Sequence, residues 1–342
     1  MGPGRVGGKP QAFPEGGKGA ILGLGQEDAM TIDAIDRAMG FAPSHDAPIP
    51  YMQRTRTMYQ AIGYDPYRWA QYAEVPFQPL AKPLAGSRVT LIVTAAPYQE
   101  GKGDQGPGAA YNAGAKFYEV LALPSDRDHD MRISHIAYDR VHSPATDQNA
   151  WFPLPMLRRF VQEGRIGGLT PHVLGAPTNR SHRHTVTVDA PEILRRCREE
   201  GTDVAVLVPN CPVCHQTVSL VARHLEANGI PTVVMGCAKD IVEFCGVPRF
   251  LFSDFPLGNA AGRPHDAESQ RATLDLALRL LEVAPAPRTT VQSPLRWSED
   301  ASWKLDYSNV ERMPPEEIQK KRDDFARQKA IAAELRRQTI AA

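Results

Sequence analysis

The chain has 342 residues, of which 42% are hydrophobic and 23% are charged, as in many globular proteins. Its 39 Lys and Arg residues balance 39 Asp and Glu residues, so no excess of charge recruits nucleic acid or an anionic membrane surface. The longest apolar runs have the length of strands and fall far short of the roughly 20 residues that cross a bilayer. We therefore expect neither a nucleic-acid partner nor a membrane span.

The N-terminal half of the chain predicts a tail, a helical region and the first strand of a sheet. Residues 1–25 are rich in glycine and proline, which indicates a flexible tail. Residues 26–86 form a helical N-terminal region, because apolar residues recur there at three- and four-residue spacing as far as about residue 72. The run "RVTLIVTAA" at 88–96 predicts a buried strand, and a helix is expected within 151–169.

The second half alternates between predicted strands and helices. The strand "DVAVLVPN" at 203–210 leads into a helix that stops near Asn228 and Gly229. Two short buried strands, at 230–236 and 249–254, are followed by a helix over 265–283. Such alternation predicts an α/β domain over 87–298, with three α/β/α layers around a mostly parallel sheet.

Residues 299–342 predict a C-terminal helical extension. The segment 314–338 has helical charge pairing but only a thin apolar stripe. We expect it to dock on a neighbour or a partner rather than to form core.

A Cys-x-x-Cys-His motif occupies the loop 209–215, directly after the predicted strand 203–210. Pro212 suits the first position of a helix, where its missing N–H costs no hydrogen bond, so Cys211 becomes the N-cap. The free N–H groups and the dipole of the helix stabilise a thiolate there. Cys214, one turn later, can attack Cys211 after that sulfur has reacted. Ligands of open α/β sheets also gather at the carboxyl ends of the strands, so the motif predicts a redox dithiol.

Three other interpretations of this motif remain open. Haem attachment uses the same pattern but requires export. Structural zinc needs four ligands, and Cys237 and Cys245 stand at the wrong spacing for a knuckle. Two buried structural cysteines at a helix start are the third possibility, and burial is also the commoner fate for Cys237. We predict the redox dithiol and no metal.

The cellular compartment is predicted from the cysteines and the N-terminus. The chain has five cysteines, an odd number that would leave one thiol unpaired in an exported protein. The N-terminal segment has no apolar core of the kind that secretory signals contain. We expect a cytoplasmic location.

Further polar residues cluster in three stretches. His135 and Asp139, within 132–153, could bind a substrate amine or move protons, or they could satisfy the backbone of a capped loop. His182 and His184 would share one face of an extended segment and could bind a metal, although a solvated basic loop is favoured because no third ligand is in view. The pair Gly258-Asn259 fits a turn beside the site.

The sequence resembles the selenoprotein B component of the glycine, sarcosine, betaine and D-proline reductases, together with its selenium-free relatives. The resemblance runs from about residue 49 to 298 and is carried by "RISHIAYDRVHSPATDQNAWFPLPMLRRF", "VLVPNCPVCHQTVSLVARHLEANG" and "FPLGNAAGRP". It implies that Cys211 takes the place of the family's selenocysteine and Cys214 that of its partner cysteine. His135, Tyr138 and Asp139 match the family's H-x-x-Y-D block, which implies that they line the pocket. The resemblance further implies reductive cleavage of a carbon–heteroatom bond, with a pyruvoyl-bearing second subunit.

We therefore predict a thiol-dependent reductase component that cleaves a C–N, C–S or C–halogen bond of a small molecule. The predicted catalytic residues are Cys211, Cys214, His215 and His135, with either histidine protonating the leaving group. The predicted substrate-binding residues are Tyr138, Asp139, Asn210, Gly258 and Asn259. We expect no bound cofactor, an external thiol reductant of the thioredoxin or glutathione type, and either a homo-oligomer or a second protein subunit. A non-catalytic subunit, or a metal- or haem-binding protein that uses Cys211, Cys214 and His215, remain the alternatives.

Overall fold

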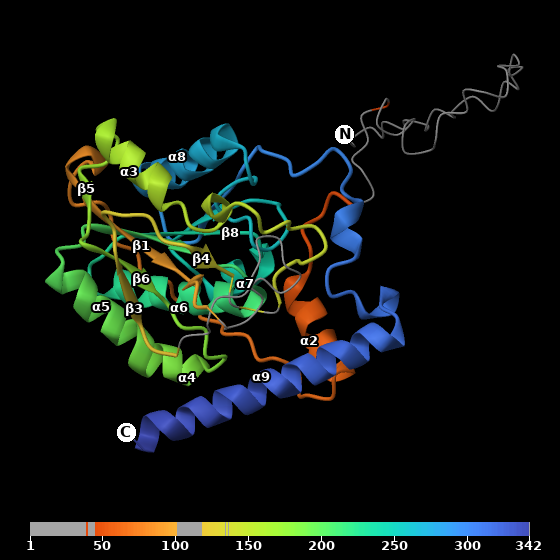
Figure 1. The fold of residues 1–342 in the computed structure, drawn as a ribbon. Coiled ribbons are helices and arrows are strands. Elements are labelled where there is room, and N and C mark those ends of the chain that lie inside the picture. The colour runs from red at the N-terminus through yellow and green to blue at the C-terminus, as the bar shows by residue number, and fades with distance from the viewer. Residues whose placement is uncertain (1–38, 40–44, 101–117, 134, 136, 342) are drawn as a thin grey trace, which may run out of the picture. The chain divides into compact units, whose positions relative to one another are not determined.

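The computed structural model describes residues 39, 45–100, 118–133, 135 and 137–341 (Figure 1). The predicted flexible tail at 1–25 and the first predicted helical segment of the 26–86 region lie outside the described residues.

A mostly parallel eight-stranded sheet forms the centre of the unit His45–Ala342, with the order β10-β9-β8-β7-β1-β6-β3 and with β5 paired to β1. Each of its pairs is parallel except β3 with β6. β7 is buried at every residue, as expected of a strand that is covered on both faces. A small antiparallel ribbon of β2 (Ala96–Pro97) and β4 (Met131–Arg132) lies outside this sheet. The strands of the large sheet are β1 (Arg88–Val93), β3 (Leu121–Pro124), β5 (Gly168–Leu169), β6 (His172–Gly175), β7 (Val204–Val208), β8 (Thr232–Gly236), β9 (Arg249–Phe252) and β10 (Thr289–Gln292).

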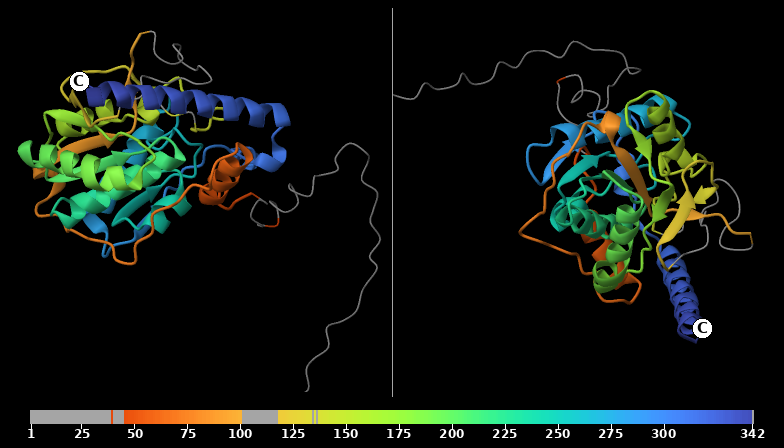
Figure 2. Two further views of the ribbon diagram at one scale, coloured as in Figure 1. Left: turned by 90° about the horizontal axis from the view of Figure 1, so that it is seen from below. Right: turned by 90° about the vertical axis from the view of Figure 1, so that its left-hand side faces the viewer.

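Helices cover both faces of the sheet (Figure 1). One face of β7 packs its Leu207 against α5 (Ala190–Glu199) and α6 (Pro212–Ala227), while Val206 and Val208 join the cluster under α3 (Leu154–Gln162) and α8 (Ala267–Val283). Seen from below, α5 and α6 lie over the strands (Figure 2, left). The predicted three-layer α/β/α fold is therefore confirmed. The remaining helices are α2 (Tyr51–Ala61), α4 (His182–His184), α7 (Lys239–Cys245) and α9 (Pro315–Ala341), with a π-helical turn at Thr185–Asp189 and 3-10 turns at Leu84–Gly86, Gln148–Ala150, Ser302–Leu305 and Val310–Arg312.

The strands and helices predicted between residues 88 and 283 are confirmed, but four strands of the sheet, β3, β5, β6 and β10, were missed, as was the ribbon of β2 and β4. β3, β6 and β10 have only four residues each, and β3 and β10 are half-buried or exposed, so no long apolar run marks them. The helix predicted as far as residue 72 is wrong, because α2 ends at Ala61 and Gly63 and Pro66 follow.

The segment after α2 crosses the molecule without regular structure as far as the turn at Leu84, and α6 holds it in place. The backbone N–H of Ala70 donates to Gln216 Oε1 at 2.6 Å, and that of Gln78 donates to Glu226 Oε2 at 2.5 Å. Glu226 also pairs with buried Arg249 at 2.8 Å. Side chains of the helix therefore satisfy backbone groups that a sheet would otherwise pair.

α9 packs its first half against α2. Phe325 joins Met58 and Ile62 in a separate apolar cluster, and Arg322 Nη2 donates to the carbonyl of Ala61 at 3.0 Å. This extension therefore docks within its own chain, and its docking on a partner stays a prediction. In the part of the chain that the structure describes, no helix combines the length and apolar character of a membrane span.

The carboxyl ends of β1 and β7 lie at the point where the strand order of the sheet reverses. From β1 the chain moves to β6 on one side, and from β7 it moves to β8 on the other, so the strand order reverses between these neighbours. Open α/β sheets bind their ligands at such a switch point. Thr94, directly after β1, accepts a hydrogen bond from the backbone N–H of Asn210, after β7, at 3.1 Å. The Cys-x-x-Cys motif begins at the next residue.

Candidate functional site around Cys211

Cys211 caps the N-terminus of α6, as predicted. Its backbone is extended (φ −128°, ψ 170°), Pro212 opens the helix, and its Sγ accepts a hydrogen bond from the backbone N–H of Cys214 at 3.3 Å. The sulfur thus stands where a side-chain oxygen caps most helices. An N–H donor and the positive end of the helix dipole both favour a thiolate at this place.

The two cysteines of the motif form a buried pair. Their sulfur atoms lie 2.6 Å apart, and Thr178 Oγ1 donates to Cys214 Sγ at 3.5 Å. Burial raises the pKa of the Cys214 thiol, but the hydrogen bond from Cys211, the charge and hydrogen bond of His135 and the hydrogen bond of Thr178 outweigh it and lower that pKa well below its ordinary value. The pair is therefore built to hold one thiolate between its two sulfurs.

A cavity of about 150 Å³ opens onto Cys211. Cys214 is not among its lining residues, so one sulfur faces the cavity and the other lies behind it. The volume is small beside the roughly 300–1,000 Å³ of pockets for drug-sized ligands. Five parts of the chain supply the walls: α2, the loop at 135–141, Arg180, the start of α6, and residues 306–325 leading into α9.

His135 completes a three-residue cluster with the dithiol. One ring nitrogen of His135 and the sulfurs of Cys211 and Cys214 all lie within 4.8 Å of one another, and all three residues are buried. His135 also lines the cavity. The structure thus brings together three of the four predicted catalytic residues.

His215, the fourth predicted catalytic residue, is not among the residues that line the cavity. Its Nδ1–H donates to the carbonyl of Cys211 at 2.7 Å, and its Nε2 accepts from the backbone N–H groups of Cys237 at 2.9 Å and Ala238 at 3.2 Å. Complete burial lowers the pKa of His215 to about 4, so the ring is neutral. Because both nitrogens serve the backbone and the ring does not line the cavity, His215 ties α6 to the loop after β8 and is not placed to protonate a leaving group.

Tyr138 and Asp139 line the cavity, and Asp139 also braces its own loop. Its Oδ1 accepts from the backbone N–H groups of Val141 at 3.1 Å and His142 at 3.0 Å. The hydrogen bond that the His142 ring donates to Asp139 outweighs burial and raises the pKa of His142. Both interpretations of this stretch, a pocket wall and a capped loop, therefore hold in part.

Asn210, Gly258 and Asn259 are not among the residues that line the cavity, so their contact with a substrate stays a prediction. Gly258 has φ 103°, and a Cβ there would stand 3.1 Å from Ile133 Cδ1 and 3.3 Å from Tyr138 Cδ2. Asn259 Nδ2 donates to Ser143 Oγ at 2.6 Å. This turn therefore shapes the loop that carries Tyr138.

Asn210 is fully buried beside Cys211, and its side-chain amide nitrogen and oxygen both lack a hydrogen-bond partner among the described residues. Such a group is costly to keep in a folded protein, so it marks a place where a ligand or water would be stabilised.

Sequence reasoning missed the walls that α2, α9 and Arg180 provide. Tyr59 and Phe325 line the cavity from the two helices, and the guanidinium carbon of Arg180 lies 4.6 Å from the centroid of the Phe325 ring. Arg180 has φ 55°, in the left-handed region. The periodic apolar residues of α2 were a visible signal, but their contact with α9 is a tertiary feature.

The remaining candidates lie elsewhere. His182 and His184 form part of a helical turn instead of an extended segment, and they contact Tyr72 Oη at 2.7 Å and Asp189 Oδ1 at 3.4 Å. Burial raises the pKa of Cys197 to about 11 and that of Cys245 to about 12, and burial together with Asp254 raises that of Cys237. These residues lie outside the cavity.

The chain is similar to the D-proline reductase subunit gamma of Acetoanaerobium sticklandii. The two are 29% identical over 221 residues, which cover 64% of this chain and 88% of the relative. This similarity supports membership in the proline/glycine reductase family. No family model and no solved structure matches the chain. The resemblance stated from the sequence is thus confirmed at the level of the family, while the selenoprotein B component within it stays a prediction.

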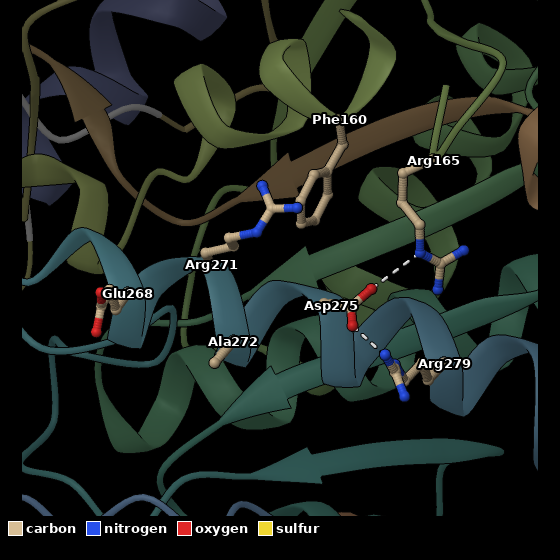
Figure 3. A pocket seen from close by; sticks show the side chains of 7 residues that line it. All are labelled: Phe160, Arg165, Glu268, Arg271, Ala272, Asp275 and Arg279. Carbon is tan, nitrogen blue, oxygen red and sulfur yellow. Dashed lines mark hydrogen bonds and ion pairs between the residues drawn. The ribbon is translucent and has the colours of Figure 1, made fainter. Parts of the chain in front are cut away.

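A surface hollow lies between α3 and α8 and shares no lining residue with the thiol cavity. Figure 3 shows Asp275 between Arg165 and Arg279, with distances of 2.9 and 2.7 Å. Arg271 pairs with Glu163 at 2.7 Å and lies over the Phe160 ring. Because all three of its arginines are paired, the hollow offers no cation to a ligand.

Proposed function

We propose that this chain is a thiol-dependent reductase component that cleaves a carbon–heteroatom bond of a small molecule. The observation that carries the proposal is the arrangement of the dithiol: Cys211 faces a cavity, and Cys214 lies behind it with the sulfurs 2.6 Å apart. A nucleophile must meet the substrate, whereas a resolving thiol must meet only the nucleophile. The membership in a reductase family supports the same chemistry.

The proposed reaction has two steps. The Cys211 thiolate attacks the substrate carbon, so a C–S bond forms while the bond to nitrogen, sulfur or halogen breaks and the leaving group takes its electron pair and a proton. The Cys214 thiolate then attacks Cys211 Sγ, so an S–S bond forms, the C–S bond breaks, and the carbon takes that electron pair and a second proton. In sum, two thiols are oxidised to one disulfide and R–X is reduced to R–H and H–X. An external dithiol or glutathione reduces the disulfide for the next cycle.

His135 is the proton donor in this proposal. It lines the cavity and lies in the cluster with both sulfurs, whereas the ring of His215 is held by the backbone. A histidine whose ordinary pKa is near 6.5 can supply a proton at neutral pH.

Arg180 defines the class of substrate that we propose. It lines the cavity, and among the described residues no carboxylate forms an ion pair with it. A guanidinium binds a carboxylate through two parallel hydrogen bonds, so a small substrate that carries a carboxylate fits this wall. The relative is named for D-proline, and a carbon–nitrogen bond is therefore the first to test.

A second protein subunit is part of the proposal, because the relative is named as a subunit. The α9 extension supplies part of the cavity wall. A second subunit that docks on α9 would therefore lie close to the thiols. A reducing cytoplasm suits a dithiol that must be reduced after each turnover. If the isolated chain is inert and the partner does the chemistry, the alternative of a non-catalytic subunit is the better description.

The test is alkylation of the reduced protein followed by intact-mass analysis over a pH series. We expect iodoacetamide to label Cys211 well below the reference thiol pKa of about 8.5, and mild oxidation to protect it as a disulfide with Cys214. The matched control is Cys245→Ser, which removes a buried thiol outside the cavity and should label as the wild type does. Iodoacetate, the carboxylate counterpart of iodoacetamide, should react faster with wild type than with Arg180→Gln by about tenfold, while iodoacetamide shows no such difference.

Turnover is then measured with D-proline and other small carboxylates, with dithiothreitol as reductant and with the partner subunit where one co-purifies. Cys211→Ser should lower the rate by at least about 1,000-fold, and Cys214→Ser should accumulate a covalent adduct on Cys211 because the resolving thiol is missing. Failure of both cysteines to label would contradict the dithiol, and full turnover by Cys211→Ser would contradict its role as nucleophile.

A further inference from the structure

We propose that His135, Cys211 and Cys214 form a binding site for a thiophilic divalent cation of the zinc type, with one coordination position open to the cavity. This site goes beyond the proposed reductase function, because it requires no substrate and no turnover. The motif's sequence pointed to His215 as the histidine of any metal site, and the structure brings a different histidine to the sulfurs.

The three ligand atoms come together from two separate parts of the chain. Cys211 and Cys214 stand at the start of α6, while His135 lies in the loop after β4, and the three atoms lie within 4.8 Å of one another. Zinc binds thiolates at about 2.3 Å and imidazole nitrogens at about 2.0–2.1 Å. A tetrahedral ion at those lengths would set the two sulfurs about 3.8 Å apart. The sulfurs, now 2.6 Å apart, reach that separation by a small outward rotation of the side chains.

The charge of the site favours a divalent cation in this buried place. Two thiolates and a neutral imidazole carry two negative charges, which one divalent ion neutralises. A neutral complex avoids the desolvation penalty that an isolated buried charge would suffer. All three residues are buried, since the exposed fraction is 7% for His135, 1% for Cys211 and 0% for Cys214.

The surroundings already supply the hydrogen bonds that metal thiolates receive. The backbone N–H of Cys214 donates to Cys211 Sγ at 3.3 Å, and Thr178 Oγ1 donates to Cys214 Sγ at 3.5 Å. Hydrogen bonds of this kind orient metal ligands and tune their basicity. They would persist with an ion in place, because each uses a different lone pair of its sulfur.

Three protein ligands leave one of the four positions of a tetrahedral ion unfilled. Cys211 and His135 line the cavity whereas Cys214 does not, so the fourth position points into the cavity. Two cysteines, one histidine and an open position form a known type of zinc site that accepts water or a small ligand. Ion and disulfide exclude each other, because a disulfide removes both thiolates. Bound metal would therefore keep the dithiol reduced and prevent it from attacking a substrate.

His215 cannot take the place of His135 in this site. Its Nε2 accepts two backbone hydrogen bonds and its Nδ1–H donates to the carbonyl of Cys211. A metal bond at either nitrogen would break those contacts and leave backbone groups unpaired in the core.

The test is titration of the full chain, reduced and kept free of oxygen, with Co²⁺ and then with Zn²⁺ in competition. We expect one ion per chain, an absorption band of thiolate-to-cobalt charge transfer, and displacement of Co²⁺ by Zn²⁺. Cys211→Ser and Cys214→Ser should each weaken binding by at least about 100-fold, and His135→Ala by about 10- to 100-fold. Cys245→Ser should bind as the wild type does. His215→Gln, whose amide oxygen can replace Nε2 as the backbone acceptor, should weaken binding less than His135→Ala does. Protein first oxidised with diamide should bind no ion.

Two results would overturn the inference: a reduced wild type that binds no ion, or His135→Ala that binds as tightly as the wild type. Loss of binding in His215→Gln together with its retention in His135→Ala would assign the site to the other histidine. The alkylation experiment separates this inference from the proposed function. If Cys211 labels rapidly but no metal binds, the metal-site inference is contradicted and the reductase proposal stands. If metal binds but the thiols do not label in the metal-free protein, the reductase proposal is contradicted and the metal site stands.

Discussion

The thiol cavity and the hollow between α3 and α8 both contain charged or reactive side chains. In the hollow the charged side chains form ion pairs with one another, whereas Arg180 of the cavity forms no ion pair with any residue that the structure describes. In the hollow, Arg165 pairs with Asp275 at 2.9 Å (Figure 3). Arg165 also pairs with Glu282 at 2.8 Å. In the cavity, Arg180 has no carboxylate within ion-pair distance among the described residues. The amide of Asn210, next to Cys211 in the chain, is buried without a hydrogen-bond partner among the described residues.

This difference separates structural polar groups from functional ones. An unpartnered buried amide costs about 1–3 kcal/mol of stability, and exposed ion pairs contribute up to about 1 kcal/mol. A ligand or an ordered water would stabilise an unpartnered buried amide, whereas the ion pairs in the hollow already satisfy each other at the surface of α8. The comparison predicts that changes near α6 alter both stability and thiol chemistry, and that changes in the hollow alter stability alone.

The largest expected effect concerns His215, which holds α6 to the loop after β8. Its pKa is lowered by burial from 6.5 to about 4, so between those pH values the unfolded chain binds a proton that the folded chain does not. The contribution of neutral His215 to the unfolding free energy is therefore fully present above about pH 6.5. It is lost as the pH falls toward 4, which lowers the unfolding free energy by about 3 kcal/mol. Urea unfolding from pH 7 to pH 4 measures this loss.

The variant His215→Gln isolates the contribution of this one group, because glutamine does not titrate. Its unfolding free energy should fall less steeply with decreasing pH than that of the wild type. Parallel pH profiles for the two proteins would show that the ring is not the buried neutral group described above.

The substitution Gly236→Ala at the end of β8 is expected to lower the unfolding free energy by about 1–3 kcal/mol, the next largest effect. A Cβ there would lie 2.8 Å from both Cδ2 and Nε2 of the His215 ring, so the ring and α6 must shift. Because α6 carries the dithiol, the labelling rate of Cys211 should change along with the unfolding free energy.

Gly168→Ala is the matched control for this substitution. Gly168 also lies in a strand of the sheet, but a Cβ there would meet nothing within 4 Å. It should leave the labelling rate unchanged. A wild-type labelling rate in Gly236→Ala would argue that the position of the dithiol does not depend on His215.

The smallest loss of unfolding free energy is expected for a substitution in the hollow between α3 and α8. Arg165→Ala removes ion pairs whose arginine is 23% exposed, so it should cost about 1 kcal/mol or less, and less still in high salt. Urea unfolding at low and high salt measures the cost, and alkylation of Cys211 should proceed at the wild-type rate. A slower alkylation would mean that the two regions are coupled.

The sequence predicted those elements whose conformation depends on residues close to one another along the chain. The strand 203–210, the cap at Cys211 and the helix that begins at Pro212 follow from apolar runs and cap chemistry within a few residues of one another. The parallel sheet follows from the repetition of such units. The short strands β3, β6 and β10 escaped because pairing with neighbours, and not their own composition, makes them strands.

The choice between the two histidines could not be made from sequence. His215 adjoins the dithiol along the chain, yet the helix turns its ring toward Gly236 and the backbone of Cys237. His135 is remote in sequence, and the packing of its loop brings it to the sulfurs.

The sequence by itself thus determined the α/β alternation, the family and the capped Cys-x-x-Cys pair, because each is written in neighbouring residues. Only the tertiary structure decided that His135 joins the thiols, that Arg180 lines the same cavity as Cys211, and that α2 and α9 supply walls of that cavity. Those contacts depend on how distant segments pack, and the energies that select one packing are spread over the whole core.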